Sequence, residues 1–173
     1  MISAANSPPL VASFVEPMLG STAWGVKQGH GSLLTFEFGP PKLEINEQIS
    51  RSRRFAYVRG QWHLWIYCCH WKIIQGGEQL AWSEDDEKTI ARATAMLNGQ
   101  NLIEINVGPD DGRSMFSFDL GGYLETWPYA GDATEEQWMI YNETDVLSLN
   151  ASGLFALNPS DASADMVCWG VSK

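Results

Sequence analysis

The segment from Trp62 to Trp71 constrains the fold more than any other part of the sequence, because almost every side chain in it is apolar or aromatic. In an extended chain, successive side chains point to opposite faces. One face would carry Trp62, Leu64, Ile66, Cys68 and His70, and the other His63, Trp65, Tyr67, Cys69 and Trp71. A strand exposed on one side would alternate with charged residues. The segment therefore predicts a central strand, extending to Ile74 and covered on both faces.

The size and composition of the chain favour one β-rich domain. A chain of 173 residues can bury a core of its own. Its eight tryptophans, seven phenylalanines and five tyrosines favour strands, since bulky rings fit a pleated surface. No apolar run approaches the roughly 18 residues of a membrane helix, and the first residues lack the basic start of an export signal. With three cysteines, one of which must stay unpaired, we expect a soluble protein in the reducing cytoplasm, without membrane contact.

Further strands are predicted where apolar residues alternate between turn residues. They are Trp24–Gln28, Ser32–Phe38, Leu43–Ile45, Phe55–Arg59, Asn101–Val107, Ser114–Asp119, Tyr123–Trp127, Trp138–Tyr141, Val146–Asn150 and Leu154–Leu157. Glycine-containing turns at Gly29-His30-Gly31 and Pro109–Gly112 predict two hairpins. The polar run Asn46–Arg54 is expected to form a loop.

One helix is predicted, over about Glu84–Asn98. Ser83 precedes a first turn rich in carboxylates, which favour the positive end of a helix, and Gly99 follows the last turn. The expected fold is α+β and predominantly antiparallel β: a bent sheet or partly closed barrel packed against this main helix. We expect a loosely ordered N-terminal arm at residues 1–20, a single β-rich domain at 21–158, and a C-terminal tail at 159–173.

The charge is acidic and uneven. Residues 1–113 hold ten basic and twelve acidic side chains, whereas residues 114–173 hold one and nine. Such a surface repels the phosphates of nucleic acids and attracts a basic protein. Candidate residues for partner binding are Glu125, Asp132, Glu135, Glu136, Glu143 and Asp145. The alternative is that these acids only keep the protein in solution.

The aromatic segment offers a different candidate site. His63, Trp65, Tyr67, Cys69 and Trp71 would line an aromatic cleft for a small molecule if their face of the strand were open. The alternative is that they pack in the core. His63 and Cys69 lie six residues apart, about 20 Å along a strand, so they cannot form a nucleophile-base pair.

No motif for a metal, a cofactor or a catalytic nucleophile was identified. Cys68 and His70 share a face of the strand, but two ligands do not make a zinc site. The glycine-rich stretch Gly25–Ser32 matches no phosphate-binding pattern and no nucleophile elbow. We therefore expect no cofactor.

Four stretches of the sequence resemble an uncharacterised family of small bacterial proteins. They are Leu19–Val26, Gly31–Gly39, Gly60–Cys68 and Phe118–Gly122. The resemblance implies a bacterial source and a single domain, and it carries no activity. From charge and size, the first hypothesis is a non-catalytic cytoplasmic protein-binding domain, comparable to the immunity proteins that bind secreted toxins. The second is a small-molecule-binding or enzymatic domain that uses the aromatic cleft.

Overall fold

Two antiparallel sheets form the body of the protein in the computed structural model, which describes residues 9–108 and 111–170. The first sheet has six strands, in the spatial order β1 (Ala23–Gln28), β2 (Leu34–Phe38), β5 (Trp62–Ile66), β11 (Glu136–Tyr141), β12 (Asp145–Asn150) and β13 (Phe155–Pro159). The second has five, in the order β7 (Glu78–Trp82), β6 (Cys69–Gln75), β10 (Gly122–Pro128), β9 (Ser114–Phe118) and β8 (Leu102–Val107).

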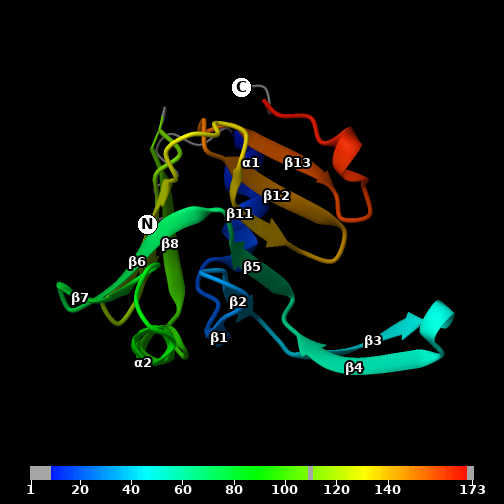
Figure 1. Ribbon diagram of the computed structural model, residues 1–173, viewed down its shortest axis with the longest axis horizontal. Helices are drawn as coiled ribbons and strands as arrows, with labels where there is room; N and C mark the ends of the chain where they lie inside the picture. The colour runs from blue at the N-terminus through cyan, green and yellow to red at the C-terminus, as the bar shows by residue number, and fades with distance from the viewer. Residues whose placement is uncertain (1–8, 109–110, 171–173) are drawn as a thin grey trace.

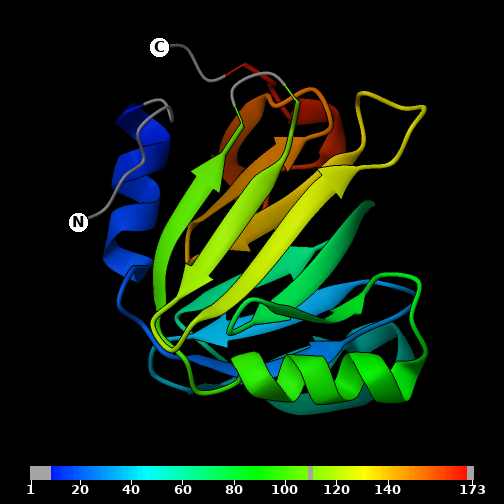
Figure 2. The same cartoon turned by 90° about the vertical axis from the view of Figure 1, so that its left-hand side faces the viewer.

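The hydrophobic core lies between the two sheets, which face each other in Figure 2. The rings of Phe36 and Phe118, one from each sheet, stack with centroids 6.3 Å apart. Trp138 of the six-stranded sheet donates its indole N–H to Ser114 Oγ of the other sheet at 2.8 Å. The sheets have separate edge strands, so the fold is a pair of packed sheets, and the partly closed barrel was wrong.

The segment Trp62–Trp71 is not one strand covered on both faces. It divides at Tyr67 and Cys68, and the chain crosses there from β5 in one sheet to β6 in the other. Even-numbered residues are buried before the crossing, and odd-numbered residues are buried after it, beginning with Cys69. Both sets of side chains face the same core from opposite sides. This change explains why the sequence carries apolar residues on both faces.

The start of β11 fixes the crossing through hydrogen bonds. Backbone N–H groups of Tyr67 and Cys68 donate to the carbonyls of Gln137 and Glu136, at 2.8 and 3.1 Å. The fully buried side chain of Gln137 donates from Nε2 to the Cys68 carbonyl at 3.0 Å. The two residues that leave the ladder are thus satisfied by the neighbouring strand.

The main helix, α2 (Glu87–Leu97), begins later than predicted. Asp86, and not Ser83, caps it, because the Asp86 carboxylate accepts from the backbone N–H groups of Lys88 and Thr89 at 2.9 and 3.1 Å. Ile90, Ala93, Thr94 and Leu97 face the core. The helix lies against β1 and β7, at one edge of each sheet. Among the described residues, no helix has the length and apolarity to cross a membrane.

Both ends of the chain contain structure beyond the predicted domain of residues 21–158. Residues 9–18, part of the expected loose arm, form α1 (Pro9–Val15) and the 3-10 turn η1 (Glu16–Met18). Val11, Val15 and Met18 are buried in the core. In the expected tail, a further 3-10 turn, η3 (Ala164–Met166), follows β13. Residues 1–8 and 171–173 lie outside the described residues.

The predicted hairpins β1–β2 and β8–β9 are confirmed by their antiparallel pairing, although residues 109–110 of the second turn lie outside the described residues. The strand β7 was not predicted. The expected loop Asn46–Arg54 belongs to a longer hairpin of β3 (Lys42–Gln48), the 3-10 turn η2 (Ile49–Arg51) and β4 (Arg53–Arg59). This hairpin, residues 42–59, is called the arm below. It projects from the body in Figure 1.

Replacing Gln137 with Met should lower the free energy of unfolding by about 1–3 kcal/mol, because the carbonyl of the half-buried Cys68 loses its side-chain donor. The matched control is Gln79→Met at an exposed position of β7, which should change stability by less than about 0.5 kcal/mol. Urea unfolding followed by tryptophan fluorescence measures both. Equal stability of the two variants would contradict the role assigned to Gln137.

Candidate functional site

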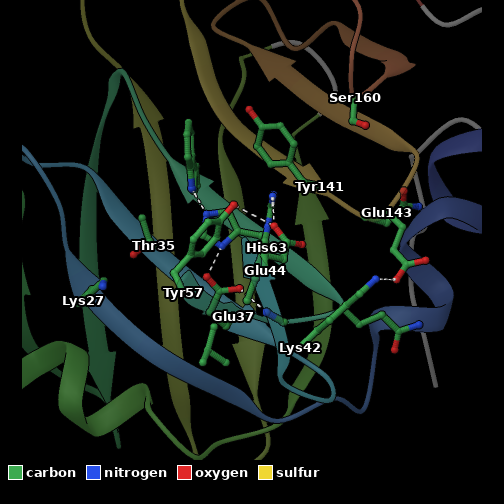
Figure 3. A pocket seen from close by; sticks show the side chains of 16 residues that line it. Lys27, Thr35, Glu37, Lys42, Glu44, Tyr57, His63, Tyr141, Glu143 and Ser160 are labelled. Carbon is green, nitrogen blue, oxygen red and sulfur yellow. Dashed lines mark hydrogen bonds and ion pairs between the residues drawn. The ribbon is translucent and has the colours of Figure 1, made fainter. Parts of the chain in front are cut away.

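The main candidate site is an open groove between the arm and the outer face of the six-stranded sheet, with a cavity volume of about 610 Å³. We call it the arm groove (Figure 3). The sheet contributes Lys27, Thr35, Glu37, His63, Trp65 and Tyr141, and the arm contributes Lys42, Glu44, Tyr57, Val58 and Arg59. Further lining residues are Gly60, Gln61, Asn142, Glu143 and Ser160. Its walls are therefore aromatic and charged.

The arm leaves the sheet at Gly39 and returns to it at Gly60. Gly39 has a φ of +76°, a conformation that favours glycine. At Gly60, a Cβ atom would lie 2.5 Å from the backbone oxygen of Phe38, so no other residue fits without a shift of the backbone. The Gly60 N–H donates to Glu37 Oε2 at 2.8 Å. These local requirements set the direction of the arm and thereby form the groove.

At the base of the groove, Glu37, His63 and Trp65 form a chain of polar contacts. His63 Nδ1 lies 2.5 Å from Glu37 Oε1. The two atoms are in close contact, but their alignment does not meet the criteria for a hydrogen bond. The indole N–H of Trp65 donates to His63 Nε2. Because an indole nitrogen can only donate, Nε2 must be unprotonated, and Nδ1 carries the proton beside Glu37. Nε2 is therefore occupied by the Trp65 indole, and Nδ1 lies against the Glu37 carboxylate without an aligned hydrogen bond.

The charged side chains that the arm contributes to the groove are also paired. Lys42 Nζ lies 2.8 Å from Glu143 Oε1, and this ion pair links the arm to the turn after β11. The Tyr57 hydroxyl donates to Glu44 Oε2 at 2.9 Å, and this hydrogen bond raises the pKa of Tyr57. The guanidinium of Arg59 lies 5.7 Å from the centre of the Tyr141 ring. The groove thus presents paired charges and aromatic faces.

The structure separates the five residues of the predicted aromatic cleft. His63 and Trp65 line the arm groove. Tyr67, at the crossing between the sheets, is 44% exposed and does not line it. Cys69 and Trp71 are fully buried in the core. The change of face at the crossing separates the first pair from the last.

The six predicted partner-binding acids lie in three places. Glu125 is on β10 of the five-stranded sheet, where Lys72 and Arg113 contact it at 2.7 and 3.0 Å. Asp132, Glu135 and Glu136 lie before and at the start of β11. Glu143 and Asp145 lie at its other end, in the turn to β12. Six residues of strand between them span about 20 Å. The acids of the last two groups flank one half of the six-stranded sheet.

Sequence reasoning did not find the residues that shape the groove. Glu37, Tyr57, Arg59 and Tyr141 lie in predicted strands, where alternation gave no reason to separate them from other surface residues. Only the position of the arm brings them together. One signal in the sequence indicated a long hairpin: the turn residues Gly39-Pro40-Pro41 at its start and Gly60 at its end.

The described residues contain no group of three or more His, Cys, Asp or Glu side chains placed to hold a metal ion. His70 turns away from Cys68: its Nδ1 lies 3.4 Å from Ser83 Oγ and 3.9 Å from Glu84 Oε1.

Comparison with known proteins yielded no match to a family model, to a curated protein or to a solved structure. The resemblance to a bacterial family stays a prediction, and the functional argument rests on the geometry of this chain.

The thiols should react in the order Cys168, Cys68, Cys69. Cys168 is exposed, whereas Cys68 is half-buried. Burial, followed by the charges of Glu135 and Glu136, raises the pKa of the Cys68 thiol and lowers its thiolate fraction. Burial raises the pKa of Cys69 far more. Timed alkylation with iodoacetamide and peptide mass spectrometry measure the order, and denatured protein is the control. Labelling of Cys69 at the rate of Cys168 in folded protein would contradict this assignment.

His63 should carry its proton on Nδ1, as its contact with the Trp65 indole requires. Nitrogen-15 spectra of histidine-labelled protein distinguish the two neutral tautomers. Trp65→Phe removes the indole donor and should populate the Nε2–H form. Trp82→Phe, beside His70, is the control and should leave the His63 spectrum unchanged. An Nε2–H form in the unmodified protein would contradict the assignment.

Proposed function

We propose that this chain is a non-catalytic protein-binding domain that holds a partner protein along the arm and the adjoining acidic half of the six-stranded sheet. The observation that carries the proposal is the arm. Its two strands pair with each other and with no other strand of the described chain. A two-stranded hairpin is marginally stable in water by itself. An arm of this length therefore favours a protein that is completed by a partner.

The arm exposes apolar side chains that the fold does not cover. Leu43, Ile45 and Val58 are 64%, 59% and 54% exposed, and Ile49 at the tip is 86% exposed. Leu43 pairs directly with Val58 across the hairpin, and Ile45 pairs with Ala56, so these side chains share one face. An exposed apolar face with a polar rim is typical of an interaction surface. The face supports contact with another protein on the side of the hairpin opposite to Glu44 and Tyr57, which line the arm groove.

The acidic half of the sheet supports a basic partner. Strands β11, β12 and β13 come from a region, residues 114–172, that contains nine acidic side chains and no lysine or arginine. A basic protein would be drawn to this half by its field, and salt would weaken the attraction. Five of the six predicted acids belong to this proposal. The sixth, Glu125, lies on the other sheet and is paired with Lys72.

The polar groups of the groove support a non-catalytic role. A general base needs a nitrogen or oxygen free to reach a substrate proton. His63 uses one ring nitrogen toward Trp65 and the other toward Glu37. Cys69 is fully buried, and its thiol contacts the Gln137 carbonyl at 3.4 Å. These contacts favour binding over chemistry.

An immunity protein is one form of this function. A small acidic domain that holds a basic toxin would use charge attraction for rapid capture and apolar contacts for retention. In this form of the function, the domain binds such a toxin in the cytoplasm. Co-expression with a toxin encoded beside this protein tests the immunity role directly. Protection of the cells supports this role. Death of cells that express the unmodified protein rejects it.

A second candidate function is small-molecule binding in the arm groove. Its volume of about 610 Å³ is in the range of ligand pockets, about 300–1,000 Å³, and Trp65 and Tyr141 offer two aromatic rings with centroids 5.4 Å apart. A thermal-shift screen with cationic, anionic and neutral metabolites tests this candidate. A ligand that shifts the midpoint of unfolding and is lost in Trp65→Ala would favour it.

Substitution of the arm should abolish partner binding without unfolding the body. Leu43→Ser with Val58→Ser removes two exposed apolar side chains and should weaken binding by about tenfold or more. The partner is first captured from the source cells, then purified and measured by biolayer interferometry. Leu120→Ser is the matched control, because Leu120 is 69% exposed and lies outside the arm. Equal affinity of the arm variant and the control would reject the arm as the binding surface.

A further inference from the structure

A second cavity adjoins the arm groove on the outer face of β11, β12 and β13, with a volume of about 540 Å³. We call it the tail cavity, because the segment after β13 forms one wall. The sheet contributes Glu136, Met139, Tyr141, Val146, Ser148 and Asn158, and the other residues are Thr134, Ser160, Ala162, Val167 and Trp169. Tyr141 and Ser160 line both cavities, so the two adjoin each other.

Backbone hydrogen bonds hold this wall in position. The Ser160 N–H donates to the Thr144 carbonyl at 2.8 Å, at the near end of the segment. The Gly170 N–H donates to the Phe155 carbonyl at 3.0 Å, at the far end. Trp169, next to Gly170, is thereby fixed over the sheet as a lining residue. The cavity is formed by the folded chain before any ligand binds.

Among the described residues that line the tail cavity, Glu136 alone is charged. Burial raises the pKa of its carboxyl, so the environment does not compensate its charge. The structure shows no hydrogen bond or ion pair to its side-chain oxygens from any described residue. Burial raises the pKa of the nearby Tyr141 phenol, and the negative charge of Glu136 raises it further.

Two other part-buried carboxylates, Glu37 and Glu125, are compensated. Glu37 accepts from the Gly60 N–H and contacts His63. Glu125 contacts Lys72 and Arg113. Glu136 differs because residues 114–172 contain no lysine or arginine that could reach it from its own half of the sheet. A part-buried charge without a partner is costly, and a cation from outside would relieve the cost.

The surroundings of the carboxylate define the kind of cation. Met139 and Trp169 supply apolar and aromatic surface beside it, which suits an aliphatic stem and a positively charged head. A single carboxylate is too few ligands for calcium or magnesium, and an anion would be repelled. We propose that the tail cavity binds the side chain of a lysine or arginine, with its charged head on Glu136 and its carbons against Met139 and Trp169.

The source of this side chain rests on the proposed function, since a basic partner would supply it. The site itself is testable without the partner. The probe is Nα-acetyl-L-lysine N-methylamide, and the neutral comparison is the corresponding norleucine amide. Titration of the full chain, followed by ¹H–¹⁵N spectra, should show saturable shifts of the Trp169 indole and Gly170 amide signals with the lysine probe, and much weaker binding of the norleucine probe.

Glu136→Gln should weaken binding of the lysine probe on the order of fivefold or more, because it removes the charge and keeps the shape. Glu135→Gln is the matched control: it removes the same charge one residue away, outside the cavity lining, and should change affinity less than twofold. Well-dispersed spectra of both variants verify folding. Equal losses in the two variants, or equal binding of the lysine and norleucine probes, would overturn the cation site.

The two proposals fail separately. If the captured partner binds the arm but the lysine probe does not bind the tail cavity, the cation site is wrong and the binding function stands. If the probe binds through Glu136 while no partner binds the arm, the cation site stands and the proposed function is rejected.

Discussion

The crossing at Tyr67 and Cys68 is the constraint on which the rest of the structure depends. It places β5 and β6 in different sheets and reverses which side chains are buried, so that both strands face one core. The buried amide of Gln137 and the backbone at the start of β11 satisfy the two residues that leave the ladder. Gln137 Nε2 is paired at this position, whereas its buried Oε1 has no hydrogen-bond partner among the described residues.

The position of β5 in turn determines where the arm can go. The arm connects β2 to β5, which are neighbours in the six-stranded sheet, so its two ends are held side by side. Gly39 and Gly60 permit the chain to leave and return at that edge of the groove. The arm then stands over the outer face of the sheet without a neighbouring strand (Figure 1). Its exposed apolar residues are a consequence of this arrangement, because nothing in the described chain covers them.

Charge divides the outer face of the six-stranded sheet into two parts. Near the arm, carboxylates meet cations, as in the pair of Lys42 and Glu143. Near the C-terminal segment, residues 114–172 contain no lysine or arginine, and no described residue forms an ion pair with Glu136. The two parts adjoin at Tyr141, which lines both cavities. A ligand that follows this face would meet apolar contacts at one end and an uncompensated negative charge at the other.

The sequence by itself determined the local features: β-rich character, the hairpins β1–β2 and β8–β9, the helix near residue 90, and the uneven charge. These follow from alternation, turn residues and composition, which act over a few neighbours. The tertiary structure decided that Trp62–Trp71 divides between sheets, that His63 and Trp65 line a groove while Cys69 and Trp71 are buried, and that the arm projects. These features depend on pairing between distant strands. An apolar run has the same sequence pattern whether it forms one strand covered on two faces or crosses from one sheet to another.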